Sequence, residues 1–131
     1  MEKTTLLKKR EDMARQPLEN CHGGTGALDW IVVLDHNDLK DRGLNFVHDD
    51  ILPPGVSIGA HKHTKDEEYY YIVSGKGTMT LDQDRFEVTE GDMTAVYPGG
   101  VHGLENTGTE DLRIIVISAR VKPERDASGG K

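Results

Sequence analysis

The sequence predicts an all-β domain, an antiparallel sandwich or barrel preceded by a short N-terminal arm. Glycine accounts for 15 of the 131 residues, and nearly all of these glycines lie between structured runs, where they permit tight turns. Short β-branched and aromatic runs recur at intervals of about ten residues, which is typical of all-β domains. A chain of this length forms a single domain.

The predicted elements follow one another along the chain. Residues 1–20 are polar and charged and have too thin an apolar stripe for a helix, so we expect an arm of no defined structure. With the glycine-rich loop, this arm occupies residues 1–27, the barrel occupies 28–121 and a disordered tail 122–131. The strand-like runs are 30–34, 44–52, 56–60, 69–73, 78–81, 86–89, 93–97 and 112–119, separated by turn signals at 53–55, 74–75, 82–85, 90–92 and 98–100.

The glycine-rich segment 22–26 reads His-Gly-Gly-Thr-Gly. A phosphate-binding loop would need a lysine and a following helix, and the segment has neither. It is therefore interpreted as a flexible turn.

Charge and composition exclude several functions. The chain has 23 acidic and 16 basic residues, a net charge of −7 and a pI near 5.3, so it repels nucleic-acid phosphates and anionic lipid. No apolar run reaches the ~18 residues of a membrane span, and the first residues lack a secretory signal, so a cytoplasmic location is expected. The single cysteine, Cys21, excludes an intramolecular disulfide and an all-cysteine zinc site.

Histidines carry the chemistry that the sequence suggests. His61 and His63 are two residues apart, so on a strand they project from the same face and can share a metal ion. Glu68 follows after a turn, and His102 follows the Pro-Gly-Gly segment much later. Three imidazoles and a carboxylate suit iron, manganese, nickel or zinc better than calcium.

Several nearby side chains have alternative interpretations. Glu67 is a rival ligand to Glu68. Tyr70 and Ile72 share a strand face with Glu68 and are expected to line the cavity, and Tyr97 is either a turn residue or a group near the metal. Further residues are interpreted as packing or as chemically inert: Trp30, Phe46 and His48 as packing, His22 and His36 as surface residues, and Cys21 as an inert thiol.

Two spaced motifs resemble those of the cupin family. The first reads Gly55-x5-His61-x-His63-x4-Glu68-x6-Gly75, and the second Gly91-x5-Tyr97-x-Gly99-x2-His102-x3-Asn106. The one departure is Tyr97, where the family usually has proline, and Pro98 directly follows it. Fifteen residues separate Gly75 from Gly91, in keeping with the short linker of compact single-domain cupins.

The resemblance implies a double-stranded β-helix, or jelly-roll barrel, with one divalent metal ion in its mouth. By match to the motifs, His61, His63, Glu68 and His102 are the ligands, and the metal is manganese, iron, nickel or zinc. Asn106 matches a family position that is not itself a usual ligand, and it is kept as a pocket-lining candidate.

Four protein ligands on a six-coordinate ion leave two positions for a small oxygenated acid or sugar. The leading hypothesis is therefore a metalloenzyme: a lyase or decarboxylase, an isomerase or a dioxygenase. Short cupins with a segment like HGGTG before the barrel resemble proteins described as oxalate decarboxylases. The sequence does not identify the protonated carboxylate that decarboxylation needs. The alternative is a non-catalytic, metal-dependent module that binds or senses a small molecule.

The outer surface predicts the oligomeric state. The apolar strands that include Trp30 and the run 114–117 carry more apolar surface than the interior of one narrow barrel can absorb, so part of it is expected on the outside. We therefore expect a homodimer packed sheet to sheet.

Overall fold

The computed structural model describes residues 3–121, so the tail predicted at 122–131 lies outside the described residues. None of the helices in this part of the chain has the length and apolarity that a membrane span requires. The elements in chain order are η1 (Arg10–Asp12), β1 (Ala14–Glu19), η2 (Cys21–Gly23), β2 (Ala27–Leu34), β3 (Leu44–Leu52), β4 (Ser57–Lys62), β5 (Asp66–Ser74), β6 (Lys76–Leu81), β7 (Asp84–Thr89), β8 (Met93–Val96), β9 (Val101–Glu105) and β10 (Leu112–Arg120).

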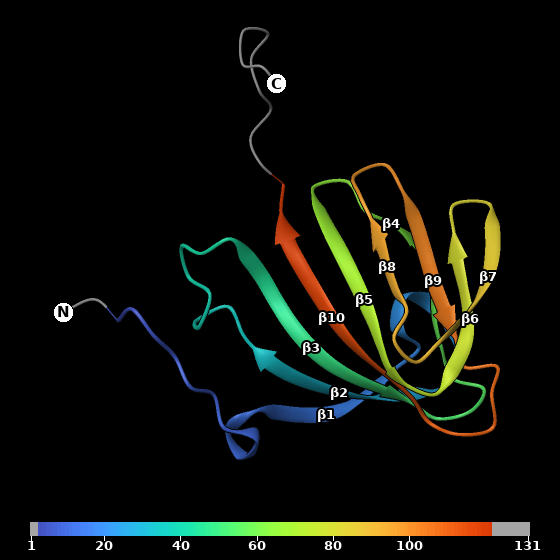
Figure 1. Cartoon of the computed structure of the whole chain (residues 1–131), viewed down its shortest axis with the longest axis horizontal. Helices are drawn as coiled ribbons and strands as arrows, with labels where there is room; N and C mark the ends of the chain where they lie inside the picture. The colour runs from blue at the N-terminus through green and yellow to red at the C-terminus, as the bar shows by residue number, and fades with distance from the viewer. Residues whose placement is uncertain (1–2, 122–131) are drawn as a thin grey trace, which may run out of the picture.

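Two antiparallel sheets form the double-stranded β-helix (Figure 1). The larger sheet has the strand order β1-β2-β3-β10-β5-β8, and the smaller has the order β4-β9-β6-β7. The buried core between them is apolar: Leu28, Leu52, Val56, Ile58, Tyr70, Ile72, Met79, Val88, Leu104, Leu112, Ile114 and Val116. The predicted all-β jelly-roll barrel is thus confirmed.

Strand β10 shows how alternation divides inner from outer side chains. Ile114 and Val116 are 0% and 4% exposed and face the core, whereas Ile115 and Ile117 are partly exposed on the other face. The core therefore absorbs half of the apolar run 114–117. It also takes in much of Trp30, which packs against the core cluster, so Trp30 does not add to the outer apolar surface as expected.

The N-terminal arm contains more structure than its composition predicted. Strand β1 pairs with β2 from Ala14 opposite Val32 to Glu19 opposite Ala27. It lies at the edge of the larger sheet, where Pro17 is tolerated because an edge strand has one side without ladder partners. The second strand that the sequence did not predict is β9, which carries His102.

The glycine-rich segment packs against β4 rather than forming a free turn. The Thr25 amide donates to the Ser57 hydroxyl at 2.9 Å, and the Ser57 amide donates to the Thr25 carbonyl at 2.9 Å. The two backbones are so close that a Cβ atom on Gly59 would overlap the His22 carbonyl oxygen. The absence of side chains at Gly24 and Gly59 therefore allows η2 to lie on the strand that carries His61.

We predict that Gly59→Ala destabilises the protein by about 2 kcal/mol, because the added methyl group forces the two backbones apart. Gly43→Ala is the matched control, since a Cβ atom there would meet nothing within 4 Å. Urea unfolding of both variants checks this. Equal unfolding midpoints for the two variants would contradict the close packing of η2 on β4.

Candidate metal centre

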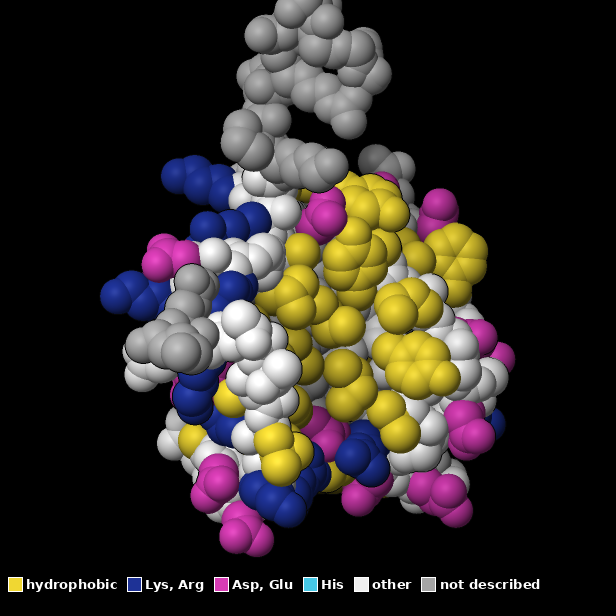
Figure 2. All heavy atoms as spheres, turned by 60° about the vertical axis from the view of Figure 1, so that its left-hand side comes forward, with side chains coloured by type: hydrophobic (Ala, Val, Ile, Leu, Met, Phe, Trp, Pro, Cys, Tyr) yellow, Lys and Arg dark blue, Asp and Glu magenta, His cyan; other side chains and the backbone are white. Residues whose placement is uncertain are grey.

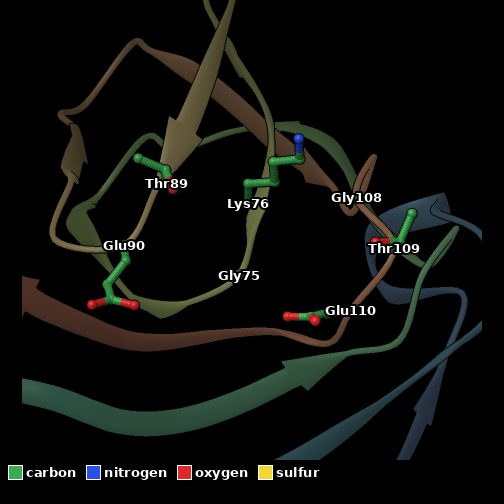
Figure 3. A pocket seen from close by; sticks show the side chains of 7 residues that line it. All are labelled: Gly75, Lys76, Thr89, Glu90, Gly108, Thr109 and Glu110. Atoms are coloured by element: carbon green, nitrogen blue, oxygen red, sulfur yellow. The ribbon is translucent and has the colours of Figure 1, made fainter.

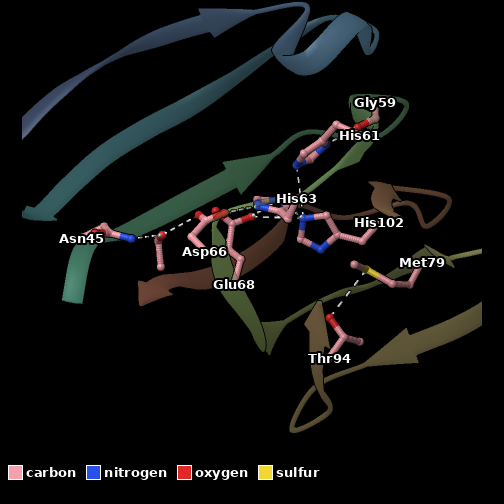
Figure 4. Close-up of polar contacts among 10 residues, drawn as sticks. Asn45, Gly59, His61, His63, Asp66, Glu68, Met79, Thr94 and His102 are labelled. Atoms are coloured by element: carbon pink, nitrogen blue, oxygen red, sulfur yellow. Dashed lines mark hydrogen bonds and ion pairs between the residues drawn. The ribbon is translucent and has the colours of Figure 1, made fainter. Parts of the chain in front are cut away.

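Four side chains from three strands and one turn converge between the sheets (Figure 4). His61 and His102 face each other across the β4–β9 pair, His63 follows β4, and Glu68 comes from β5 in the opposite sheet. One ligand atom from each of the four lies within 4.8 Å of the others. The structure thus brings together all four residues that the sequence proposed as ligands.

The Nε2 atom of His102 lies at the centre of this cluster. It is 3.2 Å from His61 Nε2 and 3.1 Å from His63 Nε2. It is also 3.1 Å from Glu68 Oε1, and His102 itself is 0% exposed. A tilted contact with the Tyr70 ring, at 4.6 Å between centroids, packs the imidazole in place.

Hydrogen bonds at the other ring nitrogens set the tautomers of the two β4-side histidines. The Nδ1–H of His61 donates to the Gly59 carbonyl at 2.7 Å, and that of His63 donates to Asp66 Oδ1 at 2.9 Å. A ring that carries its proton on Nδ1 in this way presents the lone pair of Nε2 to the cluster. Burial is the main cause that lowers the pKa of His61 to about 4, which keeps this ring neutral.

This arrangement fits a cation. Two imidazole lone pairs and a carboxylate oxygen surround His102 Nε2, and a single N–H there can satisfy only one of the three acceptors. Buried acceptors without a donor are costly, and a divalent metal ion satisfies all of them together. Three nitrogens and one oxygen suit manganese, iron, nickel or zinc.

Asp66 is a part of the site that the sequence reading missed. Its Oδ2 accepts a hydrogen bond from the Ser118 hydroxyl at 2.9 Å, and that hydroxyl accepts one from the Asn45 side chain at 3.1 Å. Burial opposes ionisation of Asp66, but the hydrogen bonds from His63 and Ser118 outweigh it and lower the pKa of the carboxyl. Asp66 therefore orients His63. Its position three residues after His63 was the available signal.

His22 was interpreted as an ordinary surface residue, and the structure shows more. Its ring stacks on that of His61 with centroids 3.6 Å apart and an interplanar angle of 12°. Its other side is exposed, whereas His36 lies on the surface as expected. The packing of η2 on β4 is what places His22 over this ligand.

The rival carboxylate Glu67 lies outside the cluster. Its Oε1 accepts a hydrogen bond from the Tyr69 hydroxyl at 2.8 Å, and both residues come from β5 positions that alternate with Glu68 and Tyr70. The alternation of the strand therefore turns Glu68 towards the histidines and Glu67 away from them.

One of the four pocket-lining candidates lies beside the histidines, and the other three lie elsewhere. Tyr70 lies beside the histidines, and Ile72 is 0% exposed in the core. Tyr97 is 59% exposed. Asn106 secures a loop, since its side chain donates to the Leu52 and Glu110 carbonyls at 2.7 and 2.8 Å and accepts from the Gly108 amide at 2.9 Å. Of the four, only Tyr70 borders the hollow described next.

A hollow of about 110 Å³ adjoins the cluster and shares Glu68 with it. The Trp30 indole N–H donates to His48 Nδ1 at 3.1 Å on its wall, and the Phe46 ring stacks on His48 at 4.2 Å. Burial lowers the pKa of His48 to about 4 and raises the pKa of the Cys21 thiol to about 11, so both side chains are neutral. The lining residues are Leu18, Cys21, His22, Trp30, Phe46, His48, Asp50, Ile58, Glu68, Tyr70 and Val116.

A separate hollow of about 270 Å³ lies at the other end of the strands (Figure 3). It follows the β5–β6 turn and the loop before β10, and it combines Lys76 with the carboxylates of Glu90 and Glu110. The histidine cluster and its adjoining hollow are therefore the site in which metal-ligating residues and a cavity coincide.

A double-stranded β-helix with this histidine and glutamate group defines a class of small barrel proteins. The chain matches the family model described as "Cupin domain" over residues 49–118, more than half of its length, and it belongs to the cupin family.

The relatives agree with this assignment. The chain is 28% identical to an oxalate-binding protein of Thermotoga maritima over 88% of its own length and 95% of that protein. It is 44% identical to an uncharacterized protein of Methanocaldococcus jannaschii over 52% of its own length and 54% of the relative. A crystal structure from Thermotoga maritima, described as a predicted oxalate decarboxylase, superposes with a TM-score of 0.83 at 26% identity, covering 88% of this chain and 100% of that one.

We predict that Asp66→Ala weakens metal binding about 10- to 100-fold, because His63 loses the partner that sets its tautomer. Glu67→Ala is the control, since this neighbouring carboxylate bonds to Tyr69 instead. Competition with a chromophoric chelator measures both affinities for Zn²⁺. Wild-type affinity in Asp66→Ala would contradict the orienting role.

Proposed function

We propose that the protein is a metal-dependent cupin enzyme that acts on a small oxygenated acid of the oxalate class. His61, His63, Glu68 and His102 would hold one divalent ion of manganese, iron, nickel or zinc. The convergence of these four side chains beside a small hollow carries the proposal. When bound, such an ion supplies a Lewis acid that a molecule with two oxygen atoms can chelate.

The hollow limits the size of the ligand. A volume of about 110 Å³ corresponds to roughly four water molecules at their share of liquid volume. Apolar side chains, including Trp30, Phe46 and Val116, form much of its wall and exclude water from a bound molecule. A two- to four-carbon acid fits this space better than a sugar does. The two Thermotoga maritima descriptions, an oxalate-binding protein and a predicted oxalate decarboxylase structure, support the same substrate class.

A second candidate function is metal-dependent binding of the same acid without turnover. The name of the relative that is matched over almost its whole length, an oxalate-binding protein, favours it. The two candidates share the metal and the ligand and differ only in whether product forms.

The test is binding and turnover by metal-loaded protein. We expect calorimetry with Mn²⁺-loaded protein to detect oxalate binding that disappears in His102→Ala. Release of formate or CO₂ from oxalate would identify an enzyme, and binding without release would identify a binding module. The Asn106→Ala variant is the control for destabilisation alone, because Asn106 is not one of the four metal-ligand candidates and bonds to backbone groups. No binding of oxalate or of 2-oxo acids by the metal-loaded wild type would contradict both candidates.

We also propose that the protein is a homodimer joined through the outer face of the larger sheet. On that face Val47, Ile117, Tyr69 and Ala95 lie side by side across four strands. The next row includes Ile115, Tyr71 and Met93. Figure 2 shows hydrophobic side chains gathered into a continuous area on one side of the molecule, with most charged side chains around it. An apolar area of this kind marks an interaction surface.

Size-exclusion chromatography with light scattering tests the dimer. We expect twice the 14.5 kDa chain mass for the wild type and one chain mass for Ile117→Lys, which places a charge in the centre of the face. Phe86→Lys is the control on the smaller sheet, where Phe86 is 50% exposed. A wild-type mass of one chain would contradict the proposal.

A further inference from the structure

Asp50 is a buried carboxyl group with an oxygen atom that lacks a partner among residues 3–121. It lies in β3, is 6% exposed and lines the hollow beside the histidine cluster. Its Oδ1 atom has no hydrogen-bond partner among the residues that the structure describes. Most buried polar atoms in folded proteins are paired, so this atom is free to bond to a molecule in the hollow.

The neighbouring Asp49 shows what a structural carboxylate looks like in this strand. It faces the other side of the sheet, where Arg113 donates to both of its oxygens at 2.9 and 2.8 Å and Arg10 donates at 2.8 Å. Asp50 has no such cationic partner among the described residues. Burial, followed by repulsion from Asp49, Glu68 and Asp29, raises the pKa of Asp50 to about 8, which favours the protonated acid at pH 7 in the metal-free chain.

The polar groups around the hollow present donors. A neutral Asp50 has an O–H group to offer, and a ring of His48 whose Nδ1 accepts from Trp30 carries its proton on Nε2. Such a wall matches the oxygen atoms of an acid whose charge is balanced by a metal ion.

We propose that Asp50, as a neutral carboxylic acid, recognises the ligand by donating a hydrogen bond to one of its oxygen atoms. This inference rests on the proposed function, because it places the acid between the metal ligands and β3. It assigns Asp50 as a residue that determines specificity. Ligands that present an oxygen to Asp50 are bound, and analogues that present a methyl group there leave its O–H unpaired and are rejected.

Two substitutions at Asp50 test the donor role. Calorimetric titration of oxalate into Mn²⁺-loaded protein should show at least tenfold weaker binding for Asp50→Val, which has no donor. Asp50→Asn keeps a donor in nearly the same shape and should bind within about threefold of the wild type. Elemental analysis should find the same metal content in all three proteins, which separates this loss from loss of the metal.

Each other outcome overturns part of the account. Wild-type affinity in Asp50→Val overturns the recognition role and leaves the proposed function intact. Equal losses in both variants overturn the donor role. Failure of the metal-loaded wild type to bind oxalate contradicts the proposed function and this inference with it.

A second measurement uses the metal-free protein and needs no ligand. With a pKa of about 8 in the folded chain against an ordinary 3.8, Asp50 takes up a proton on folding between these pH values, so its contribution to stability falls as pH rises towards 8. The melting temperature of the wild type should therefore fall relative to that of Asp50→Asn between pH 5 and 8. A constant difference would overturn the neutral state. The other titratable groups lining the hollow or named as acting on Asp50 are common to both proteins: His48 and Asp49 on β3, Asp29 on β2, Glu68 and Tyr70 on β5, and Cys21 and His22 in η2.

Discussion

Three hydrogen-bond acceptors surround the Nε2 atom of His102: the Nε2 atoms of His61 and His63 at 3.2 and 3.1 Å, and Glu68 Oε1 at 3.1 Å. Most of the local structure serves to hold them there. The Gly59 carbonyl and Asp66 fix the tautomers of the first two rings, and η2 covers His61. A cation between lone pairs held this close would satisfy them together, so the cluster is suited to hold a metal ion.

Strand β3 contributes polar side chains to both the outer and the inner face of the barrel. Its alternation directs Asp49 to the outer face, where two arginines pair with it, and Asp50 to the inner face, where no arginine of residues 3–121 pairs with it. The same alternation places Phe46 and His48 on the wall of the hollow. One strand thus supplies both a structural ion pair and the polar lining of the cavity. Its two neighbouring aspartates have pKa values shifted in opposite directions, with that of Asp49 lowered and that of Asp50 raised.

Sequence patterns predicted the strands and the ligands well where the signal was local. Residues 44–52 form a strand with the predicted limits, and the spacing of His61, His63 and Glu68 identified the cluster. Strand β1 was missed because ARQPLE is polar and contains proline, and β9 because VHGLE is short and carries glycine and histidine. The roles of His22, Asp50 and Asp66 depend on how distant segments pack, which no local pattern reveals.

Elemental analysis of untagged protein purified without chelator, together with His61→Ala, tests the central claim most directly. The account predicts about one equivalent of manganese, iron, nickel or zinc in the wild type and its loss in the variant, because removal of one imidazole breaks the donor set. No metal in either protein, even after incubation with each of the four ions, would contradict the metal centre and the function built on it.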